Sequence, residues 1–223
     1  DAAGIACLFV VGEETDHIGA QAAAQSTLRP THVILGEPCG LTPAKAQKGL
    51  LKLSLSATGK AGHSAYPELG ASAIHRLIEA LSALRASPLP SDEELGMTTV
   101  NVGQITGGVA ANVIARDASA LVLIRCAAPV NVILNEVMDR LPEGVEATEI
   151  GRAEPITFSS AGEAGGPTVP FNTDAHSLAP LGAEMLLLGP GDMRCAHAAG
   201  ERLSYDDLAK GIATYARIAR HLA

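Results

Sequence analysis

The sequence predicts an α/β domain that is interrupted by a second, inserted α+β domain. Short, continuously apolar runs near both ends of the chain are typical of strands buried on both faces of a parallel sheet. Alternating apolar and polar residues in the middle are typical of an antiparallel sheet with one wet face. The expected boundaries are residues 1–48 and 155–223 for the α/β domain and residues 49–154 for the insertion.

The first segment predicts a strand–helix–strand unit. Ile5–Val11 and Val33–Leu35 are short apolar runs, and residues 19–25 between them are rich in Ala. This spacing is typical of a βαβ unit with parallel strands. Ligands of such sheets gather beyond the carboxyl ends of the strands, and acidic residues follow both runs.

The middle segment predicts strands and helices in the order β-α-β-β-α-β, which describes a ferredoxin-like sandwich. Leu51, Leu53 and Leu55 alternate with polar residues, whereas the helical stretches have apolar residues at helical spacing. The predicted elements are residues 51–57, 73–84, 98–105, 118–126, 132–141 and 145–150. The last segment returns to α/β character, with a short buried strand at Met185–Leu188 and a final helix that Ser204 caps.

Composition excludes several classes of protein. The 223 residues are 47% hydrophobic and 18% charged with a net charge of −8, which excludes a disordered chain. No basic run is present, so we expect neither a nucleic-acid nor a membrane partner. Four scattered cysteines without CxxC pairing indicate reduced thiols, hence a cytoplasmic location. Because the chain opens at Asp1 and enters an apolar run at once, we expect a fragment or a processed chain.

Carboxylates and one imidazole follow the predicted buried strands. Glu13 and Glu14 are adjacent, Glu37 lies in Gly-Glu-Pro, and His197 comes after a Gly-Pro-Gly turn. One carboxylate of a pair can bind a metal while its neighbour takes a proton from water. Carboxylate oxygen and imidazole nitrogen suit zinc or a similar divalent ion. Three ligands fill one open zinc site but cannot hold two metals, and solvated side chains are the alternative for each residue.

The inserted segment carries a second group of candidates. His63 lies in Gly-His-Ser, and Asn112 and Arg125 follow. Arg125 ends an otherwise apolar strand, so its charge needs a partner there, either a substrate carboxylate or a structural Asp or Glu. A loop histidine without function is the alternative for His63. Other catalytic classes lack their motifs, because the sequence has no GxSxG elbow, no Walker loop and no GxGxxG.

Six motifs together resemble the co-catalytic zinc aminoacylase/carboxypeptidase family, which includes acetylornithine deacetylase and succinyl-diaminopimelate desuccinylase. They occur in order along nearly the whole chain: VVGEE (Val10–Glu14), LGEP (Leu35–Pro38), QKG (Gln47–Gly49), ATGKAGHSAYPELGASAI (Ala57–Ile74), NVGQITGGVAANVI (Asn101–Ile114) and GPG…AH (Gly189–His197). The resemblance implies part of a zinc-exopeptidase-like α/β/α catalytic domain interrupted by a ferredoxin-like lid that also dimerises.

The resemblance implies a role for each candidate in the catalytic domain. Glu13 matches the general base, Glu14 and His197 match ligands of one zinc, and Glu37 matches a ligand of the other. Asp174 matches a motif with a structural role. The family also has an earlier His-x-Asp segment and a bridging Asp. Neither occurs in these residues, so the chain resembles a C-terminal part that we expect to be inactive alone.

The resemblance also implies roles for the lid. His63 matches a histidine that reaches the partner subunit's active site and steadies the oxyanion, while Asn112 and Arg125 match groups that hold the substrate. We therefore expect an amidohydrolase that removes an acyl group from an N-acyl amino acid, with two Zn²⁺ ions, or Co²⁺ as substitute, and a homodimer formed through the lid. The alternatives are a dipeptidase or carboxypeptidase of the same family and an inactive dimerising homologue.

Overall fold

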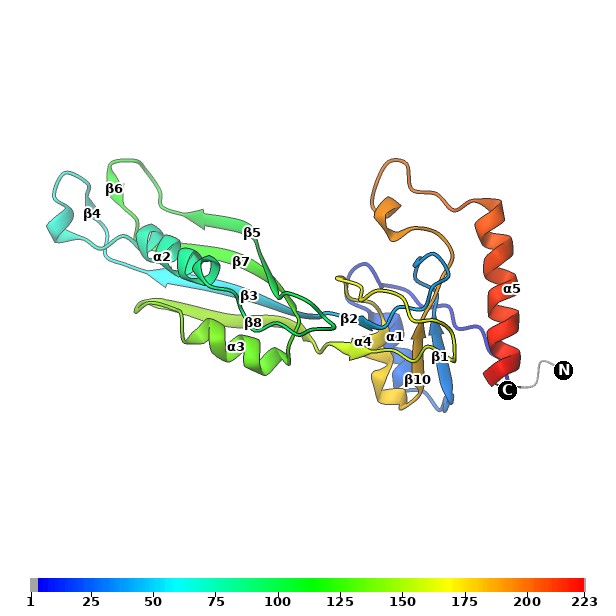
Figure 1. Cartoon of the computed structure of the whole chain (residues 1–223). Coiled ribbons are helices and arrows are strands. Elements are labelled where there is room, and N and C mark those ends of the chain that lie inside the picture. Colours follow the sequence, from blue (N-terminus) through cyan, green and yellow to red (C-terminus); the bar gives the residue numbers. More distant parts are fainter. Residues whose placement is uncertain (1–3, 223) are drawn as a thin grey trace. The chain divides into compact units, whose positions relative to one another are not determined.

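The computed structural model describes residues 4–222, and these form two compact units. The first unit comprises the described residues up to Gln47 and those from Ile156 onward. The second comprises Lys48–Pro155. The chain leaves the first unit once and returns to it once, so the second unit is an insertion (Figure 1).

The inserted unit contains four long strands, two α-helices, one 3₁₀ turn and a small sheet of two short strands. Its elements are β3 (Gly49–Thr58), β4 (Gly62–His63), η1 (Pro67–Leu69), α2 (Ala73–Ala86), β5 (Thr99–Gly107), β6 (Val113–Ile114), β7 (Asp117–Cys126), α3 (Val130–Met138) and β8 (Val145–Ala153). The long strands form an antiparallel sheet in the order β5-β7-β3-β8. This order confirms the predicted ferredoxin-like sandwich.

One face of this sheet carries the core of the inserted unit. Alternation along β3 buries Leu51, Leu53 and Leu55 completely, and they form one apolar cluster with Leu77 of α2 and Ile133 of α3. Figure 1 shows both helices running along the long strands. Because helix periodicity and strand alternation each supply one apolar face, the two layers bury those faces against each other.

In both helices of the inserted unit, a polar side chain accepts a hydrogen bond from a backbone N–H of the first turn. Ser72 is the N-cap of α2, and its Oγ accepts a hydrogen bond from the N–H of His75 at 3.3 Å. At the start of α3 the carboxylate of Glu154 accepts from the N–H of Val130 at 2.9 Å. A negative charge at this end of a helix is stabilised by the helix dipole and satisfies a free donor.

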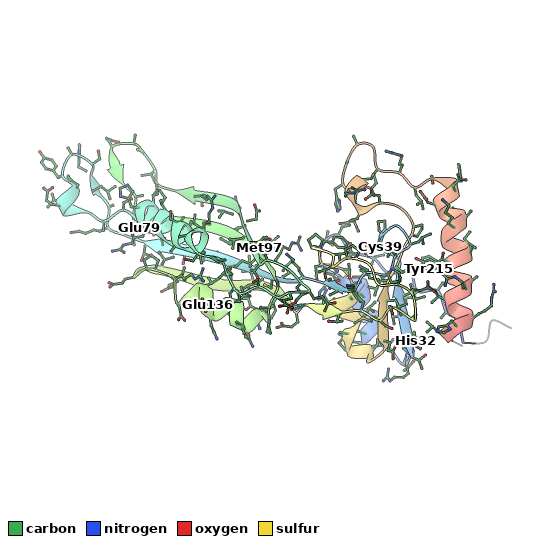
Figure 2. All side chains as sticks on the ribbon, in the orientation of Figure 1. His32, Cys39, Glu79, Met97, Glu136 and Tyr215 are labelled. Carbon is green, nitrogen blue, oxygen red and sulfur yellow. The ribbon has the colours of Figure 1, made fainter. Side chains whose placement is uncertain are left out.

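The first unit contains two parallel strands and helices drawn from both ends of the chain. Its elements are α1 (Ile18–Ala24), β1 (His32–Leu35), β2 (Ala46–Gln47), β9 (Ile156–Thr157), α4 (Ala175–Leu178), η2 (Ala179–Leu181), β10 (Glu184–Leu187), η3 (Met193–Cys195) and α5 (Tyr205–Leu222). β1 pairs in parallel with β10, from His32 opposite Glu184 to Leu35 opposite Leu187. Helix α5 contacts the residue directly after β10. The hydroxyl of Tyr215 in α5 (Figure 2) donates a hydrogen bond to the carbonyl of Leu188 at 2.6 Å.

The prediction of a buried strand at Ile5–Val11 is wrong for this structure. The segment pairs with no strand among the described residues, and Ile5, Leu8, Phe9 and Val11 are exposed. The predicted βαβ unit is therefore not formed, because the partner of β1 is β10. A run of apolar residues indicates burial only where neighbouring strands satisfy its backbone groups.

Candidate active site

A tight turn presents the adjacent carboxylates Glu13 and Glu14. Gly12 opens the turn with φ +80°, in the left-handed region that glycine adopts without steric cost. Its carbonyl oxygen accepts hydrogen bonds from the backbone N–H groups of residues 15–17, at 3.1, 3.0 and 2.7 Å. The turn is therefore closed around one carbonyl, with both carboxylates between its ends.

Glu37 lies beside the loop that follows β10. Gly189 in that loop approaches so closely that a Cβ there would lie 2.4 Å from the carbonyl oxygens of Gly36 and Glu37. The N–H of Cys39 also donates to the carbonyl of Gly189 at 3.1 Å. Because β1 and β10 are parallel, their following loops leave the same edge of the sheet, and the loop after β10 continues to His197.

His197 lies next to Glu14. The distance from His197 Nε2 to Glu14 Oε2 is 3.6 Å, and both side chains are 72% exposed. His197 has φ +59°, and its N–H donates to the carboxylate of Glu201 at 2.9 Å. A contact between side chains this exposed contributes little to stability.

Burial, together with the negative charges of neighbouring carboxylates, raises the pKa values of Glu13 and Glu37. Burial raises the pKa of Glu37 to about 7, and the negative charges of Glu13, Asp174 and Glu14 add to that shift. Burial also raises the pKa of Glu13, where Glu14 and Asp174 act in the same direction and two nearby imidazoles oppose them. The carboxylates predicted from the sequence thus lie in one neighbourhood of the first unit. Such a concentration of negative charge favours a nearby cation.

The described residues do not form a complete metal site. Within residues 4–222, no group of three or more His, Cys, Asp and Glu side chains is arranged to hold a metal ion. Glu14, Glu37 and His197 carry oxygen and nitrogen donors of the kind that zinc binds. Their chemistry fits zinc, but as placed here they supply only part of a coordination shell.

The sequence analysis missed His17. Its Nδ1 lies 2.9 Å from Oδ1 of Asp174, and its ring stands edge-on to that of His176 with centroids 4.5 Å apart. The side chain of Asp174 is only 11% exposed. A histidine three residues after a pair of carboxylates is a visible signal, but nothing local connects it with an aspartate 157 residues away.

In the inserted unit the structure brings His63 and Asn112 together. His63 lies in β4, opposite Val113 of β6, and the N–H of Ser64 donates to the carbonyl of Asn112 at 3.0 Å. Nδ1 of His63 accepts a hydrogen bond from the N–H of Ala65 at 3.1 Å. In the neutral imidazole the proton is therefore on Nε2, which is left as a donor.

Arg125 lies far from His63 within the same unit. Strand β6, which pairs with β4, precedes the first residue of β7, Asp117. Arg125 is near the other end of β7, opposite Leu50 and Thr99. The strand from Asp117 to Arg125, eight steps of about 3.3 Å each, spans roughly 26 Å. Burial lowers the pKa of Arg125, and no carboxylate among the described residues pairs with its guanidinium. The structural ion pair considered from the sequence is therefore not formed.

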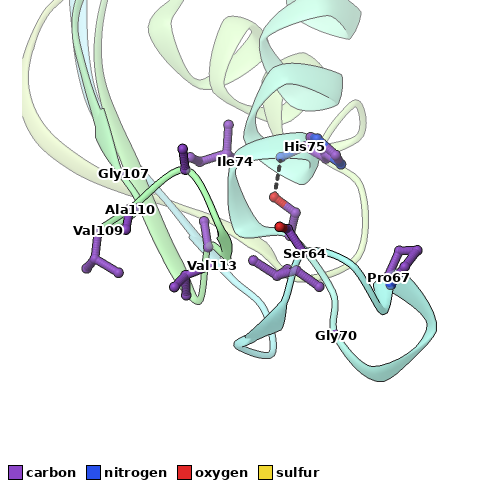
Figure 3. A pocket seen from close by; sticks show the side chains of 14 residues that line it. Ser64, Pro67, Gly70, Ile74, His75, Gly107, Val109, Ala110 and Val113 are labelled. Carbon is purple, nitrogen blue, oxygen red and sulfur yellow. Dashed lines mark hydrogen bonds between the residues drawn. The ribbon is translucent and has the colours of Figure 1, made fainter.

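A pocket of about 750 Å³ lies beside the small β4–β6 sheet (Figure 3). One wall is residues 107–111, from the end of β5 onward, and another comprises Ser64, Pro67, Gly70 and Ser72. The dashed line in Figure 3 is the capping hydrogen bond of Ser72 at the start of α2. The pocket belongs to the inserted unit, whereas the clustered carboxylates belong to the first.

Comparison with known proteins identifies the inserted unit. Residues 45–149 match the peptidase dimerisation domain of the M20 family. The sequence is 36% identical, over 97% of this chain, to a probable carboxypeptidase of Talaromyces marneffei. It is 34% identical, over 96% of this chain, to an acetylornithine deacetylase of Myxococcus xanthus. The chain is homologous to the M20 peptidases. This confirms the family resemblance predicted from the motifs.

This M20 homologue covers only part of its relatives, spanning 55% of the Talaromyces protein and 64% of the Myxococcus protein. Its fold is similar to that of aminopeptidase PepT from Bacillus cereus, with a TM-score of 0.74 and 20% identity over 95% of this chain and 62% of that one. A tripeptidase from Staphylococcus aureus gives a TM-score of 0.74 and 21% identity over 95% and 63%. At these identities the likeness concerns the fold alone. No helix within residues 4–222 is long and apolar enough to cross a membrane.

Proposed function

We propose that the complete protein is a metal-dependent amidohydrolase that removes the acyl group from an N-acyl amino acid, as an acetylornithine deacetylase does. The observation that carries the proposal is the cluster of Glu13, Glu14, Glu37 and His197 beside the carboxyl ends of two parallel strands. The 34% identity to the Myxococcus acetylornithine deacetylase supports this substrate class.

Glu13 is the general base of the proposed reaction. It takes a proton from water and then delivers it to the nitrogen that leaves as the free amine. Burial raises the pKa of Glu13, and a raised pKa makes a carboxylate a better proton acceptor. His63 donates from Nε2 to the oxyanion that develops on the acyl oxygen. Arg125 pairs with the substrate carboxylate, and Asn112 binds its amide.

Glu14, Glu37 and His197 are the proposed ligands of a two-zinc site that Co²⁺ can also occupy. Zinc supplies a Lewis acid that polarises the acyl oxygen and lowers the pKa of bound water. The described residues form only part of a coordination shell. In the proposed enzyme the remaining ligands come from a part of the complete protein outside these 223 residues. The 55% coverage of the Talaromyces relative is consistent with such a part.

The proposed enzyme is a homodimer formed through the inserted unit. The match to a dimerisation domain supports this assembly. The strand length between the His63 region and Arg125 supports it independently, because roughly 26 Å separates Asp117, which follows the partner strand of β4, from Arg125 near the end of β7. One small substrate cannot contact both residues of a single copy, whereas two copies can each supply one of them.

A carboxypeptidase or dipeptidase is the second candidate function. The relative at 36% identity is named a probable carboxypeptidase, and the structures with a similar fold include an aminopeptidase and a tripeptidase. The same residues would serve that reaction, since a peptide bond is an amide. The two candidates therefore differ in the group on the acyl side of the bond.

The test is hydrolysis by the complete protein loaded with zinc. N-Acetylornithine, other N-acetyl amino acids, and dipeptides with matched C-terminal residues are compared by release of free amine. Turnover of N-acetyl amino acids well above that of the dipeptides supports the deacetylase, and the reverse order supports the peptidase. Complete inactivity of a zinc-loaded dimer towards all of these substrates would favour a non-catalytic homologue.

A further inference from the structure

His17 has an unusual backbone for a residue with a side chain. Its φ of 57° and ψ of 24° lie in the left-handed region, directly before α1. Residues other than glycine and asparagine adopt this region at an energetic cost, and they keep it where surrounding contacts hold them there. The contact that holds His17 lies far away in the sequence.

That contact is the hydrogen bond with Asp174. Nδ1 of His17 lies 2.9 Å from Oδ1 of Asp174, and the two side chains are 19% and 11% exposed. Asp174 is itself fixed, because its carbonyl accepts from the N–H groups of Ser177 and Leu178, both at 3.0 Å, at the start of α4. The bond thus ties a local turn to a buried element from the other end of the chain.

Besides the contact with Asp174, hydrogen bonds to helix α1 anchor the turn before His17. Nε2 of Gln21 donates to the carbonyl of Asp16 at 2.7 Å, and the N–H of Gly19 donates to the carbonyl of Val11 at 3.0 Å. Glu13 is partly buried, and residues 14–16 are exposed, so no apolar side chain secures the turn. The hydrogen bonds to Gly12 hold it from within, and the shortest of them, at 2.7 Å, comes from the N–H of His17 itself. Because this bond joins His17 to the residue directly before Glu13, a movement of His17 is passed to the start of the turn, where the carboxylates lie.

We propose that the His17–Asp174 hydrogen bond is a clamp that positions the Glu13–Glu14 turn. His17 and Asp174 act through the turn and are positioning residues. The consequence for turnover rests on the proposed function, in which Glu13 is the general base. The effect of the clamp on the turn itself does not rest on it.

Three substitutions separate the hydrogen bond from the backbone strain. Asn tolerates the left-handed region, and its side-chain N–H₂ occupies the position of histidine Nδ1, so His17→Asn keeps a donor for Asp174. His17→Asp has the same shape as Asn but no donor. His17→Gly relieves the strain, adds no charge and also lacks the donor.

The first measurement is hydrogen–deuterium exchange of the 223-residue chain, read by mass spectrometry over residues 12–19. Loss of a hydrogen bond to a charged group predicts exchange about 10- to 100-fold faster in His17→Gly and His17→Asp. In His17→Asn the rate should stay near that of the unchanged chain. Exchange in β1 and β10 is the control, because a general loss of folding would accelerate those strands as well. Unchanged exchange over residues 12–19 in His17→Gly, or equal acceleration in all three variants, would overturn the clamp.

The second measurement uses the complete, zinc-loaded protein and its preferred substrate. The clamp predicts that His17→Gly lowers kcat by about tenfold or more with KM little changed, because a misplaced base slows chemistry more than binding. His17→Asn should recover most of this loss. A turn loosened in the exchange experiment with kcat unchanged would overturn the positioning role. If the unchanged protein hydrolyses no substrate, the proposed function fails, while the exchange result still decides the clamp.

Discussion

Thr98→Val tests the hydrogen bonds that fasten the start of β5 in the inserted unit. Thr98 Oγ1 donates to the carbonyl of Pro90 at 2.5 Å and accepts from the N–H of Ala127 at 2.9 Å. Thr98 is 8% exposed and Ala127 is fully buried. Valine has nearly the same shape as threonine but offers neither a donor nor an acceptor, so the buried N–H of Ala127 loses its partner.

The expected loss of stability follows from that N–H. A buried donor without a partner costs about 1–3 kcal/mol, whereas the carbonyl of the partly exposed Pro90 can turn to water. The added methyl group of valine offsets about 0.8 kcal/mol. We therefore expect the free energy of unfolding of the inserted unit to fall by about 0.2–2.2 kcal/mol, with a central value of about 1 kcal/mol.

Native-state hydrogen exchange of the slowest amides in β3 and β7 measures this free energy for the inserted unit alone. Thr106→Val is the matched control, because its hydroxyl bonds Ser119 at 2.8 Å on the exposed surface. That change should alter stability by no more than about 0.5 kcal/mol. If Thr98→Val lowers the free energy of unfolding no further than Thr106→Val does, the reasoning from the buried N–H is refuted.

Three further predictions concern single side chains. Tyr215→Phe should lower the free energy of unfolding of the first unit by about 1 kcal/mol in thermal melts. The substitution removes the hydroxyl that donates to the carbonyl of Leu188 at 2.6 Å. At pH 8.5 iodoacetamide should alkylate the exposed Cys7 but not the native Cys126, whose pKa burial raises to about 12, as peptide mass mapping would reveal. Hydrogen bonding to Arg194 lowers the pKa of Asp192 to about 2. The contribution of this carboxylate to stability is therefore complete at pH values above the ordinary pKa of Asp, and it is lost as the pH falls through about 2. In an NMR titration, Arg194→Gln should raise that pKa towards the ordinary value of about 3.9, without reaching it, because the N–H of residue 194 still donates to the Asp192 carboxylate.

Most of the inserted unit could be predicted from the sequence. The alternation from Leu51 to Leu55 marks a strand with one buried face, and the structure buries those residues completely. Every long strand of this unit finds its partners among residues 48–155. Local patterns therefore suffice there, because the elements that bury one another are close in the chain.

The first unit was harder to predict because its partners are distant in sequence. The apolar runs at Ile5–Val11 and Val33–Leu35 indicated two strands that would pair through a βαβ unit. The structure instead pairs His32–Leu35 with Glu184–Leu187, about 150 residues later. Hydrophobicity predicts that a segment is buried, but it does not say which strand lies beside it.

In the candidate site, too, local patterns could be predicted from the sequence, whereas long-range contacts could not. Glu37 was found because it follows a strand of the α/β sheet, as a general rule of such sheets predicts. Glu13 and Glu14 were found as adjacent carboxylates in the VVGEE motif, although the apolar run before them forms no strand among the described residues. The contact between His17 and Asp174 joins segments 157 residues apart, and no local pattern announces it. Long-range pairs of this kind are fixed by tertiary packing and become visible only in the folded chain.

The most direct test of the account compares Glu13→Gln with Glu14→Gln in the complete protein, measuring turnover and bound zinc in the same preparations. Glutamine keeps the shape of Glu13 but cannot accept the proton, so turnover should fall about 10²–10⁴-fold while zinc content stays nearly unchanged. Glu14→Gln should instead lower the zinc content, because it weakens a ligand. Loss of zinc in Glu13→Gln with full occupancy in Glu14→Gln, or full turnover in both variants, would contradict the assignment of base and ligand.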